Sequence, residues 1–346
     1  MSKKYRVGIL GATGTVGQRF AQLLEDHPQF EITALAASDR SAGKVYSEAC
    51  AWKLPGSIPE AVKGINVQPI EPPLDCDIVF SSLPSSVARE TEEAFARAGF
   101  PVISNSSCYR MDEDVPLLIP EINADHLGLI EMQRQKRGFG KGFIVTNPNC
   151  AVTSFAPPLA ALHRKFGIES VVVTTMQAIS GAGYPGVSSM DIADNVLPYI
   201  AGEEPKVETE SQKILGTFAN GAVTPADFSV SAQCFRVDVI DGHTASVRVD
   251  LKQPSTLEDV VEAMRSFPVL DLYSSPKTFI EVCDEPSRPQ PRLDRDNGRG
   301  MTITVGRIFP DNVFDYRFVA LSHNTVRGAA GSAILNAELL IQKGLI

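Results

Sequence analysis

The sequence predicts an α/β fold with two domains, one on a parallel sheet and one on a largely antiparallel sheet. The chain has 346 residues, more than the roughly 100 to 200 of a typical domain. Short apolar strands alternate with helical patterns in its first half, and long β-branched runs dominate its second half. We expect a first domain over residues 1–149 and a second over 150–324.

The first half begins with a strand over Tyr5 to Leu10, a Gly-rich turn and a helical pattern. Further strands are expected over 32–36, 77–83 and 101–104, with a helix over about 86–98. Neighbouring parallel strands need long crossover connections, and helices of this length supply them. This half therefore predicts a doubly wound parallel sheet.

The second half changes to long runs rich in β-branched residues, which favour a largely antiparallel sheet. These runs cover 170–176, 228–239, 244–251, 301–307 and 313–320. The final segment, 325–346, returns to helical spacing and is rich in alanine, glycine and leucine. We expect it to pack against the first domain and complete it.

Composition excludes several classes of function. The formal net charge is −9, and no basic stripe suggests nucleic acid or an anionic membrane as a partner. No secretion signal or membrane-spanning apolar run is visible, so a cytoplasmic protein is expected. The six cysteines lack metal-ligand spacing, and no metal requirement is indicated.

A glycine-rich turn follows the first strand. Gly11, Gly14 and Gly17 stand where a chain must turn tightly, let a diphosphate approach its backbone and begin a helix. The spacing differs from the usual G-x-G-x-x-G pattern, but the strand before it and the helix after it supply the expected context. A turn that binds nothing is the alternative.

The end of the second strand indicates which dinucleotide is bound. NAD sites usually carry an acidic residue there, whereas NADP sites carry small polar and basic groups. Ser38, Arg40, Ser41 and Lys44 cluster at this position, which favours NADP. Asp39 would repel a 2′-phosphate, but on an extended chain its side chain would face away from its neighbours.

Cys150 lies between an apolar strand and a helix, in the segment Asn147 to Thr153. A position near a helix N-terminus lowers the pKa of a thiol and favours the nucleophilic thiolate. A small buried cysteine is the alternative, and it is the interpretation for Cys50, Cys76, Cys234 and Cys283.

His243 is the candidate base for this nucleophile. It begins a strand after a turn, where its side chain could reach into a cleft. Taken by itself, a turn histidine is more often a surface or capping residue.

These motifs together resemble aspartate-β-semialdehyde dehydrogenases, in particular the archaeal and fungal branch. The resemblance runs essentially from end to end. It rests on the glycine turn, Thr146-Asn-Pro-Asn-Cys150, Gln177-Ala-Ile-Ser-Gly-Ala-Gly183, Gly202-Glu-Glu-Pro-Lys206, the stretch from Arg236 to His243, Pro291-Arg-Leu-Asp-Arg-Asp296 and Asn324-x-x-Arg-Gly-Ala-Ala-Gly331.

The resemblance implies a Rossmann-type domain joined to a catalytic and dimerisation domain, as in glyceraldehyde-3-phosphate dehydrogenase. It implies NADPH-dependent reduction of L-aspartyl-4-phosphate to L-aspartate-4-semialdehyde with release of phosphate. This reversible reaction serves the biosynthesis of lysine, methionine, threonine and isoleucine. A homodimer or homotetramer acting on these small molecules is expected.

The resemblance also implies a role for individual residues. The catalytic set is Cys150 as nucleophile, His243 as general acid and base, and Gln177 as the group that positions the acyl carbon. The substrate-binding set is Arg236, Glu203, Lys206, Arg110, Asn105 and Asn149. The cofactor-binding set is Gly11, Thr13, Gly14, Thr15, Val16, Ser38, Arg40, Ser41, Ser82, Leu83, Ser180, Gly181 and Asn324.

Some alternatives stay open at this point. Arg236 could form a salt bridge across the sheet, and Glu203 with Lys206 could be an ordinary surface ion pair. The same scaffold could act on another acyl donor, as malonyl-coenzyme A reductase or N-acetyl-glutamyl-phosphate reductase does. A non-catalytic protein that senses NADP is the alternative from another class, although it would need neither Cys150 nor His243.

Overall fold

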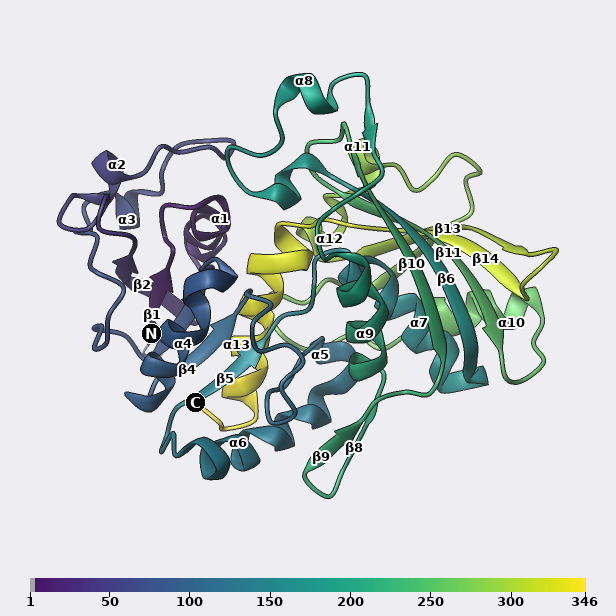
Figure 1. Cartoon of the computed structure of the whole chain (residues 1–346), viewed down its shortest axis with the longest axis horizontal. Helices are drawn as coiled ribbons and strands as arrows, with labels where there is room; N and C mark the ends of the chain where they lie inside the picture. The colour runs from purple at the N-terminus through teal and green to yellow at the C-terminus, as the bar shows by residue number, and fades with distance from the viewer. Residues whose placement is uncertain (1–3) are drawn as a thin grey trace.

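The computed structural model describes residues 4–346. Figure 1 shows two sheets side by side, with the C-terminal segment passing between them. One sheet has five strands and the other has seven. The expected combination of a parallel sheet and a largely antiparallel sheet is confirmed.

The five-stranded sheet has the order β2-β1-β3-β4-β5, and each of its pairings is parallel. Its strands are β1 (Tyr5–Leu10), β2 (Phe30–Ala36), β3 (Ile78–Ser81), β4 (Pro101–Ser104) and β5 (Phe143–Thr146). Every residue of β3, β4 and β5 is buried, as expected for parallel strands covered on both faces.

The helices around this sheet differ in length. The longer ones are α1 (Thr15–Leu24), α4 (Ser85–Arg97) and α6 (Leu129–Arg137). Short ones are α2 (Tyr46–Ala49), α3 (Glu60–Lys63), α5 (Pro120–Asn123) and the 3₁₀ turn η1 (Ala124–Gly128).

The seven-stranded sheet has the order β12-β13-β14-β11-β6-β10-β7. Its strands are β6 (Ile168–Gln177), β7 (Val196–Leu197), β10 (Ser229–Val237), β11 (His243–Leu251), β12 (Ile280–Cys283), β13 (Ile303–Pro310) and β14 (Tyr316–Ser322). Only β6 with β10 and β12 with β13 pair in parallel. Burial alternates along β6 and β11, because one face of the sheet is covered and the other is more open.

Strand register in this sheet brings three site residues together. Gln177 pairs with Arg236 where the parallel strands β6 and β10 end. The neighbouring strand β11 is antiparallel to β6, so it begins at the same edge with His243. Residues distant in the sequence therefore converge at one end of the sheet.

Helices from the second half pack against this sheet in one large hydrophobic core. They are α7 (Val152–Phe166), α9 (Glu204–Ile214) and α10 (Leu257–Arg265). Smaller elements are the turn η2 (Ile179–Ala182), α8 (Ser189–Ile192), the hairpin of β8 (Thr217–Ala219) and β9 (Ala222–Thr224), α11 (Pro291–Asp294) and α12 (Asn297–Gly300).

The C-terminal segment returns to the parallel sheet. It consists of a π-helical turn, η3 (Val326–Ala330), followed by α13 (Gly331–Gln342). Ala333, Ile334 and Leu340 share a core with residues of β1 and α1. Arg327 forms a bidentate ion pair with Glu121 at 2.9 and 2.7 Å, and both side chains are fully buried. The expected packing of this segment is observed.

Within residues 4–346, no helix combines the length and apolarity that crossing a membrane requires.

Candidate active site

The glycine turn after β1 has the geometry of a diphosphate cradle. The amides of Gly11 and Ala12 donate to Ala36 O, and Gly14 N donates to Gly11 O at 3.0 Å. A Cβ at Gly17 would collide with Gly11 O, so only glycine allows this close approach. No side chain caps α1 at Gly14, so its first amides remain available to an anion. These residues fit a dinucleotide.

The proposed 2′-phosphate end lies on an exposed turn. Ser41 N donates to Ser38 O at 2.8 Å, and Lys44 Nζ donates to Arg40 O at 2.8 Å. Ser38, Asp39 and Arg40 are exposed, whereas Ser41 is buried. The argument that Asp39 faces away on an extended chain was wrong, because the chain turns here and strand alternation does not apply.

Two cavities of about 510 Å³ each lie where residues of the parallel-sheet domain meet residues of the second domain. This volume falls within the roughly 300 to 1,000 Å³ of small-molecule sites. The cavities share Thr15, Val16, Leu83, Pro84 and Gly183. One adds residues from the glycine turn, including Thr13, Gly14 and Ser82. The other, the catalytic cavity, contains Cys150.

Most of the predicted cofactor residues line these cavities. Ser180, Gly181 and Asn324 lie in the catalytic cavity, where Asn324 Nδ2 donates to Ser180 Oγ at 2.8 Å. Ser82 Oγ donates to Leu10 O at 2.9 Å. Gly181 lies so close to Arg236 and His243 that an added Cβ would be 2.8 Å from the Arg236 guanidinium. Their role toward a cofactor stays a prediction.

Cys150 lines the catalytic cavity, and His243 contacts it from a fully buried position. Cys150 stands two residues before α7, as expected. Its Sγ is 3.2 Å from Nε2 of His243, which is completely buried. Ala178 N donates to His243 Nδ1 at 3.0 Å. A neutral imidazole with an accepting Nδ1 carries its proton on Nε2, so that proton faces the sulfur.

The expected low pKa of Cys150 is wrong for this resting site. Burial raises the pKa of the thiol to about 12, and the charge of Glu203 adds to the rise, whereas Arg110 and Arg236 oppose it. Burial lowers the pKa of His243 to about 3, and the charge of Arg236 acts in the same direction. Desolvation outweighs the helix N-terminus here, so thiol and imidazole are both neutral at rest.

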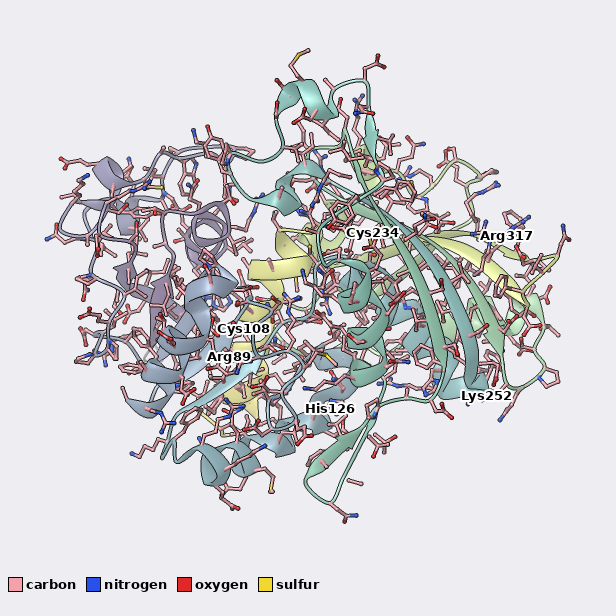
Figure 2. The ribbon with its side chains drawn as sticks, viewed as in Figure 1. Arg89, Cys108, His126, Cys234, Lys252 and Arg317 are labelled. Atoms are coloured by element: carbon pink, nitrogen blue, oxygen red, sulfur yellow. The ribbon has the colours of Figure 1, made fainter. Side chains whose placement is uncertain are left out.

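The other cysteines test the expectation of buried, inert thiols. Cys50, Cys76 and Cys234 are buried, but Cys283 is half-buried. The expectation for Cys283 was therefore wrong, because β12 is an edge strand. Figure 2 places Cys234 on the sheet and Cys108 near α4, beside Arg89. Cys108 is half-buried and does not line the catalytic cavity.

Arg236 and Gln177 approach the cavity from the strand ends. Arg236 Nη1 donates to Ala178 O at 2.8 Å, and its side chain is buried. Among residues 4–346 Arg236 has no ion-pair partner, which leaves its charge to a ligand. Gln177 is buried and donates to Glu203 at 3.1 Å.

Glu203 and Lys206 form an ion pair of 3.2 Å at the start of α9. Glu203 is buried and also accepts from Asn149 Nδ2 at 2.7 Å. Burial alone would raise the pKa of Glu203, but Asn149, Lys206 and Gln177 hold it below its usual range. Both residues line the catalytic cavity. The alternative of an ordinary surface ion pair is therefore excluded.

The remaining predicted contacts are largely committed within the protein. Asn149 Oδ1 accepts from Ala151 N at 2.8 Å at the start of α7. Asn105 Nδ2 donates to Ser81 O at 3.0 Å, and its Oδ1 accepts from Asn147. Arg110 donates to Glu210 at 2.9 Å and to Asn105 O at 2.8 Å. All three predicted residues, Asn105, Arg110 and Asn149, line the catalytic cavity.

Several groups at the site were missed in the sequence. Ser85, Ser106 and Ser107 place hydroxyls at the cavity edge, and the serine-rich run before Arg110 was a visible signal for Ser106 and Ser107. Glu210 and the Ala178 amide contact site residues directly, but nothing in the local sequence distinguished them.

Two family profiles match the chain. "Semialdehyde dehydrogenase, NAD binding domain" matches residues 6–130, and "Semialdehyde dehydrogenase, dimerisation domain" matches 159–327. An "Aspartate-semialdehyde dehydrogenase" of Archaeoglobus fulgidus is 54% identical, with 99% of this chain and 100% of that one covered. One from Trichophyton rubrum is 50% identical, with 99% of each chain covered.

Solved structures give the same result. Aspartate semialdehyde dehydrogenase of Candida albicans, crystallised with NADP, matches with a TM-score of 0.91 and 45% identity, covering 99% of this chain and 100% of that one. An aspartate semialdehyde dehydrogenase II of Vibrio cholerae, complexed with ASA, matches with a TM-score of 0.79 and 26% identity over 99% of each chain.

Proposed function

This chain belongs to the aspartate-semialdehyde dehydrogenase family, and from that premise we propose that it reduces L-aspartyl-4-phosphate to L-aspartate-4-semialdehyde with NADPH. The reaction is reversible, and it supplies the biosynthesis of lysine, methionine, threonine and isoleucine. One observation carries the proposal: a cysteine in the wall of a cavity with two buried arginines lies 3.2 Å from a fully buried histidine.

The glycine turn supports the cofactor assignment. The free amides at the start of α1 would hold the diphosphate, and Ser38, Arg40 and Ser41 would contact the 2′-phosphate. The relative from Candida albicans was crystallised with NADP, which supports the same assignment for this chain. Bound NADPH would supply the hydride. Ser180, Gly181 and Asn324 would lie beside the reacting end of the cofactor.

Cys150 is the proposed nucleophile. In the reductive direction its sulfur attacks the acyl carbon as the thiol loses its proton, the C–O bond to phosphate breaks, and phosphate leaves with that proton. A thioester on Cys150 remains. Hydride addition to the thioester carbon and proton addition to its oxygen would yield a thiohemiacetal. It releases the aldehyde when the C–S bond breaks and its hydroxyl proton passes to the sulfur. Dividing the reaction through a covalent intermediate lowers each barrier.

Arg236 is proposed to hold the α-carboxylate of the substrate. A guanidinium offers two parallel donors to a carboxylate, and burial strengthens that contact. Glu203 is proposed to face the α-amino group, and Lys206 with Arg110 to face the phosphate. Gln177 is proposed to orient the acyl carbon.

His243 is proposed to control the proton at Cys150. Nε2 can donate a hydrogen bond to the thiolate or to the acyl oxygen, and either bond stabilises charge that develops during attack. Accepting a proton at Nε2 requires the other tautomer and the loss of the Ala178 hydrogen bond. The donor role therefore has more support than the base role expected from the sequence.

The test follows absorbance of the reduced cofactor. Purified protein receives aspartate semialdehyde, NADP and phosphate, and a parallel assay receives malonyl-coenzyme A and NADPH. We expect phosphate-dependent NADPH formation that Cys150→Ala abolishes. Turnover with malonyl-coenzyme A alone would contradict aspartyl phosphate as the substrate and assign malonyl-coenzyme A instead. Absence of turnover in both assays would contradict the assignment as an enzyme.

The chain also contains a dimerisation domain of this family over 159–327. We infer a homodimer or homotetramer in the cytoplasm, with cofactor binding by residues 1–149 and 325–346 and chemistry by residues 150–324. Light scattering would measure the number of chains. In hydrogen exchange, NADP should first protect amides of the glycine turn, and protection confined to 150–324 would contradict this division.

A further inference from the structure

Helix α9 carries a second pair of charged residues facing the same region as Glu203 and Lys206. Glu210 and Lys213 follow them by seven residues, which is about two helical turns and keeps all four on one face. Glu210 and Lys213 are both buried. Burial of two charged residues deep on a helix requires specific partners.

The carboxylate of Glu210 joins two parts of the site. Oε1 accepts from Arg110 Nη1 at 2.9 Å, and Oε2 accepts from Asn149 N at 2.6 Å. Arg110 belongs to the loop after β4, and Asn149 precedes Cys150. The Glu210 side chain therefore sets the distance between the Arg110 guanidinium in the cavity wall and the turn that carries Cys150.

Arg110 retains donors for a ligand. It uses Nη1 for Glu210 and Nη2 for Asn105 O, while its buried Nε has no hydrogen-bond partner in the described structure. The Arg110 side chain is 9% exposed and lines the catalytic cavity. A buried guanidinium with free donors is suited to a phosphate oxygen.

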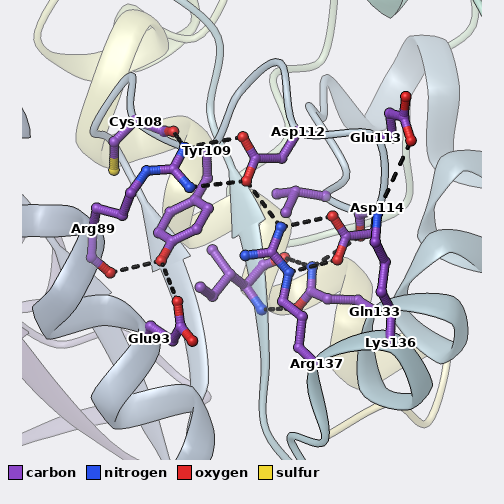
Figure 3. Close-up of polar contacts among 12 residues, drawn as sticks. Arg89, Glu93, Cys108, Tyr109, Asp112, Glu113, Asp114, Gln133, Lys136 and Arg137 are labelled. Atoms are coloured by element: carbon purple, nitrogen blue, oxygen red, sulfur yellow. Dashed lines mark hydrogen bonds and ion pairs between the residues drawn. The ribbon is translucent and has the colours of Figure 1, made fainter.

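Lys213 binds the side of the Arg110 loop that faces α9. Its Nζ donates to Arg110 O, Asp112 O and Val115 O at 2.8, 2.8 and 2.9 Å. The outer side of the loop is held separately. Figure 3 shows Asp112 between Arg89 and Arg137, and Asp114 on Arg137. With its outer side anchored to α4 and α6, the loop depends on α9 for its position relative to Cys150.

We propose that Glu210 is a positioning residue for the phosphate step, acting through Arg110 and the Asn149 amide. This inference rests on the proposed function, because it assigns phosphate as the anion at Arg110. Replacing Glu210 by glutamine leaves a donor group facing either the Arg110 guanidinium or the Asn149 amide, both of which are donors themselves. At least one of the two hydrogen bonds must then be lost.

The experiment compares Glu210→Gln with Glu208→Gln. Glu208 lies on the same helix and loses the same charge, but its Oε1 accepts from Ala232 N and it does not line the cavity. Two quantities are measured: KM for phosphate in NADP-dependent oxidation, and the concentration of inorganic phosphate that halves alkylation of Cys150 by iodoacetamide. For Glu210→Gln both should rise about tenfold, as for one charge-assisted hydrogen bond, while kcat changes less.

The outcomes are separable. Wild-type protein without phosphate-dependent turnover would contradict the proposed function, whereas the alkylation assay would still report on Glu210. If Glu210→Gln and Glu208→Gln give equal phosphate values, the positioning role is overturned. A Glu210→Gln variant that unfolds is replaced by Glu210→Asp, which keeps the charge but is too short to reach both partners. In an Arg110→Gln background the effect of Glu210→Gln on phosphate should disappear, and persistence would also contradict the proposal.

Discussion

The catalytic cavity and the exposed turn at the end of β2 both carry charged residues, but in opposite environments. In the cavity, Arg236, Glu203 and Gln177 are buried, and so is His243 behind Cys150. At the turn, Ser38, Arg40 and Lys44 are exposed. Charges in the cavity shift the pKa values of Cys150 and His243.

This difference in burial matches two tasks: chemistry in the buried cavity and cofactor recognition at the exposed turn. Interactions in a buried cavity are strong and interdependent, because little solvent screens them. Interactions on an exposed turn are weaker and depend on ionic strength. Substitutions in the cavity should therefore have large effects that resist salt, and substitutions at the turn should have small effects that salt removes.

The largest effect is expected for Cys150→Ala. Loss of the nucleophile removes the covalent route, and turnover should fall on the order of 10⁴-fold or more. The measurement is phosphate-dependent NADPH formation. Cys283→Ala is the control, because Cys283 lies on the edge strand β12, and its activity should match wild type. Substantial turnover by Cys150→Ala would exclude the thioester route.

Next comes His243→Ala, for which kcat should fall roughly 10²- to 10⁴-fold, the range for a lost proton-handling group. His243→Gln should fall less, because a glutamine amide can still donate toward Sγ. Steady-state rates of both variants decide between the two roles. If glutamine and alanine are equally damaging, proton transfer is required and the donor role alone is insufficient.

A smaller effect concerns the pH dependence of Cys150. With its pKa raised to about 12, the thiolate fraction grows with pH, and the rate of alkylation without substrate should rise about tenfold per pH unit between pH 7 and 10. Glu203→Gln removes a negative charge that raises this pKa, so its rate at pH 8 should be several-fold higher. A plateau near pH 7 in wild type would show a thiolate already formed.

The smallest effect is expected at the exposed turn. Arg40→Ala should raise KM for NADP roughly three- to tenfold at low salt and leave kcat unchanged. The difference from wild type should shrink in 0.5 M salt, an ionic strength chosen as roughly three to five times physiological. Lys141→Ala, which removes an exposed lysine before β5, serves as the charge control. A large effect that persists in salt would mean that Arg40 becomes buried when the cofactor binds.

Local patterns were sufficient for much of the fold and for part of the site. The strand over Tyr5 to Leu10 has the predicted bounds, and Pro101–Ser104 does as well. Both are short apolar runs between clear turn signals, where local preference and burial agree. Gly17 and Cys150 were also identified, because a strand-turn-helix order is visible in adjacent residues.

Local patterns failed where a residue's role depends on a distant partner. Glu210 lies 100 positions from Arg110 and 61 from Asn149, and in the sequence it is one of several charged residues on a polar helix. Arg327 and Glu121 are 206 positions apart, yet they form a fully buried ion pair. Nothing in either local pattern indicates that these charges are desolvated.

By itself, the sequence determined the order of strands and helices, the glycine cradle and a cysteine before a helix, since each depends on neighbours in the chain. The tertiary structure decided the ionisation of that cysteine. The helix N-terminus favours a thiolate, but burial raises its pKa to about 12. The desolvation cost of a charge depends on every atom packed around it, and those atoms come from β6, β10, β11 and α9, which meet only when the chain has folded.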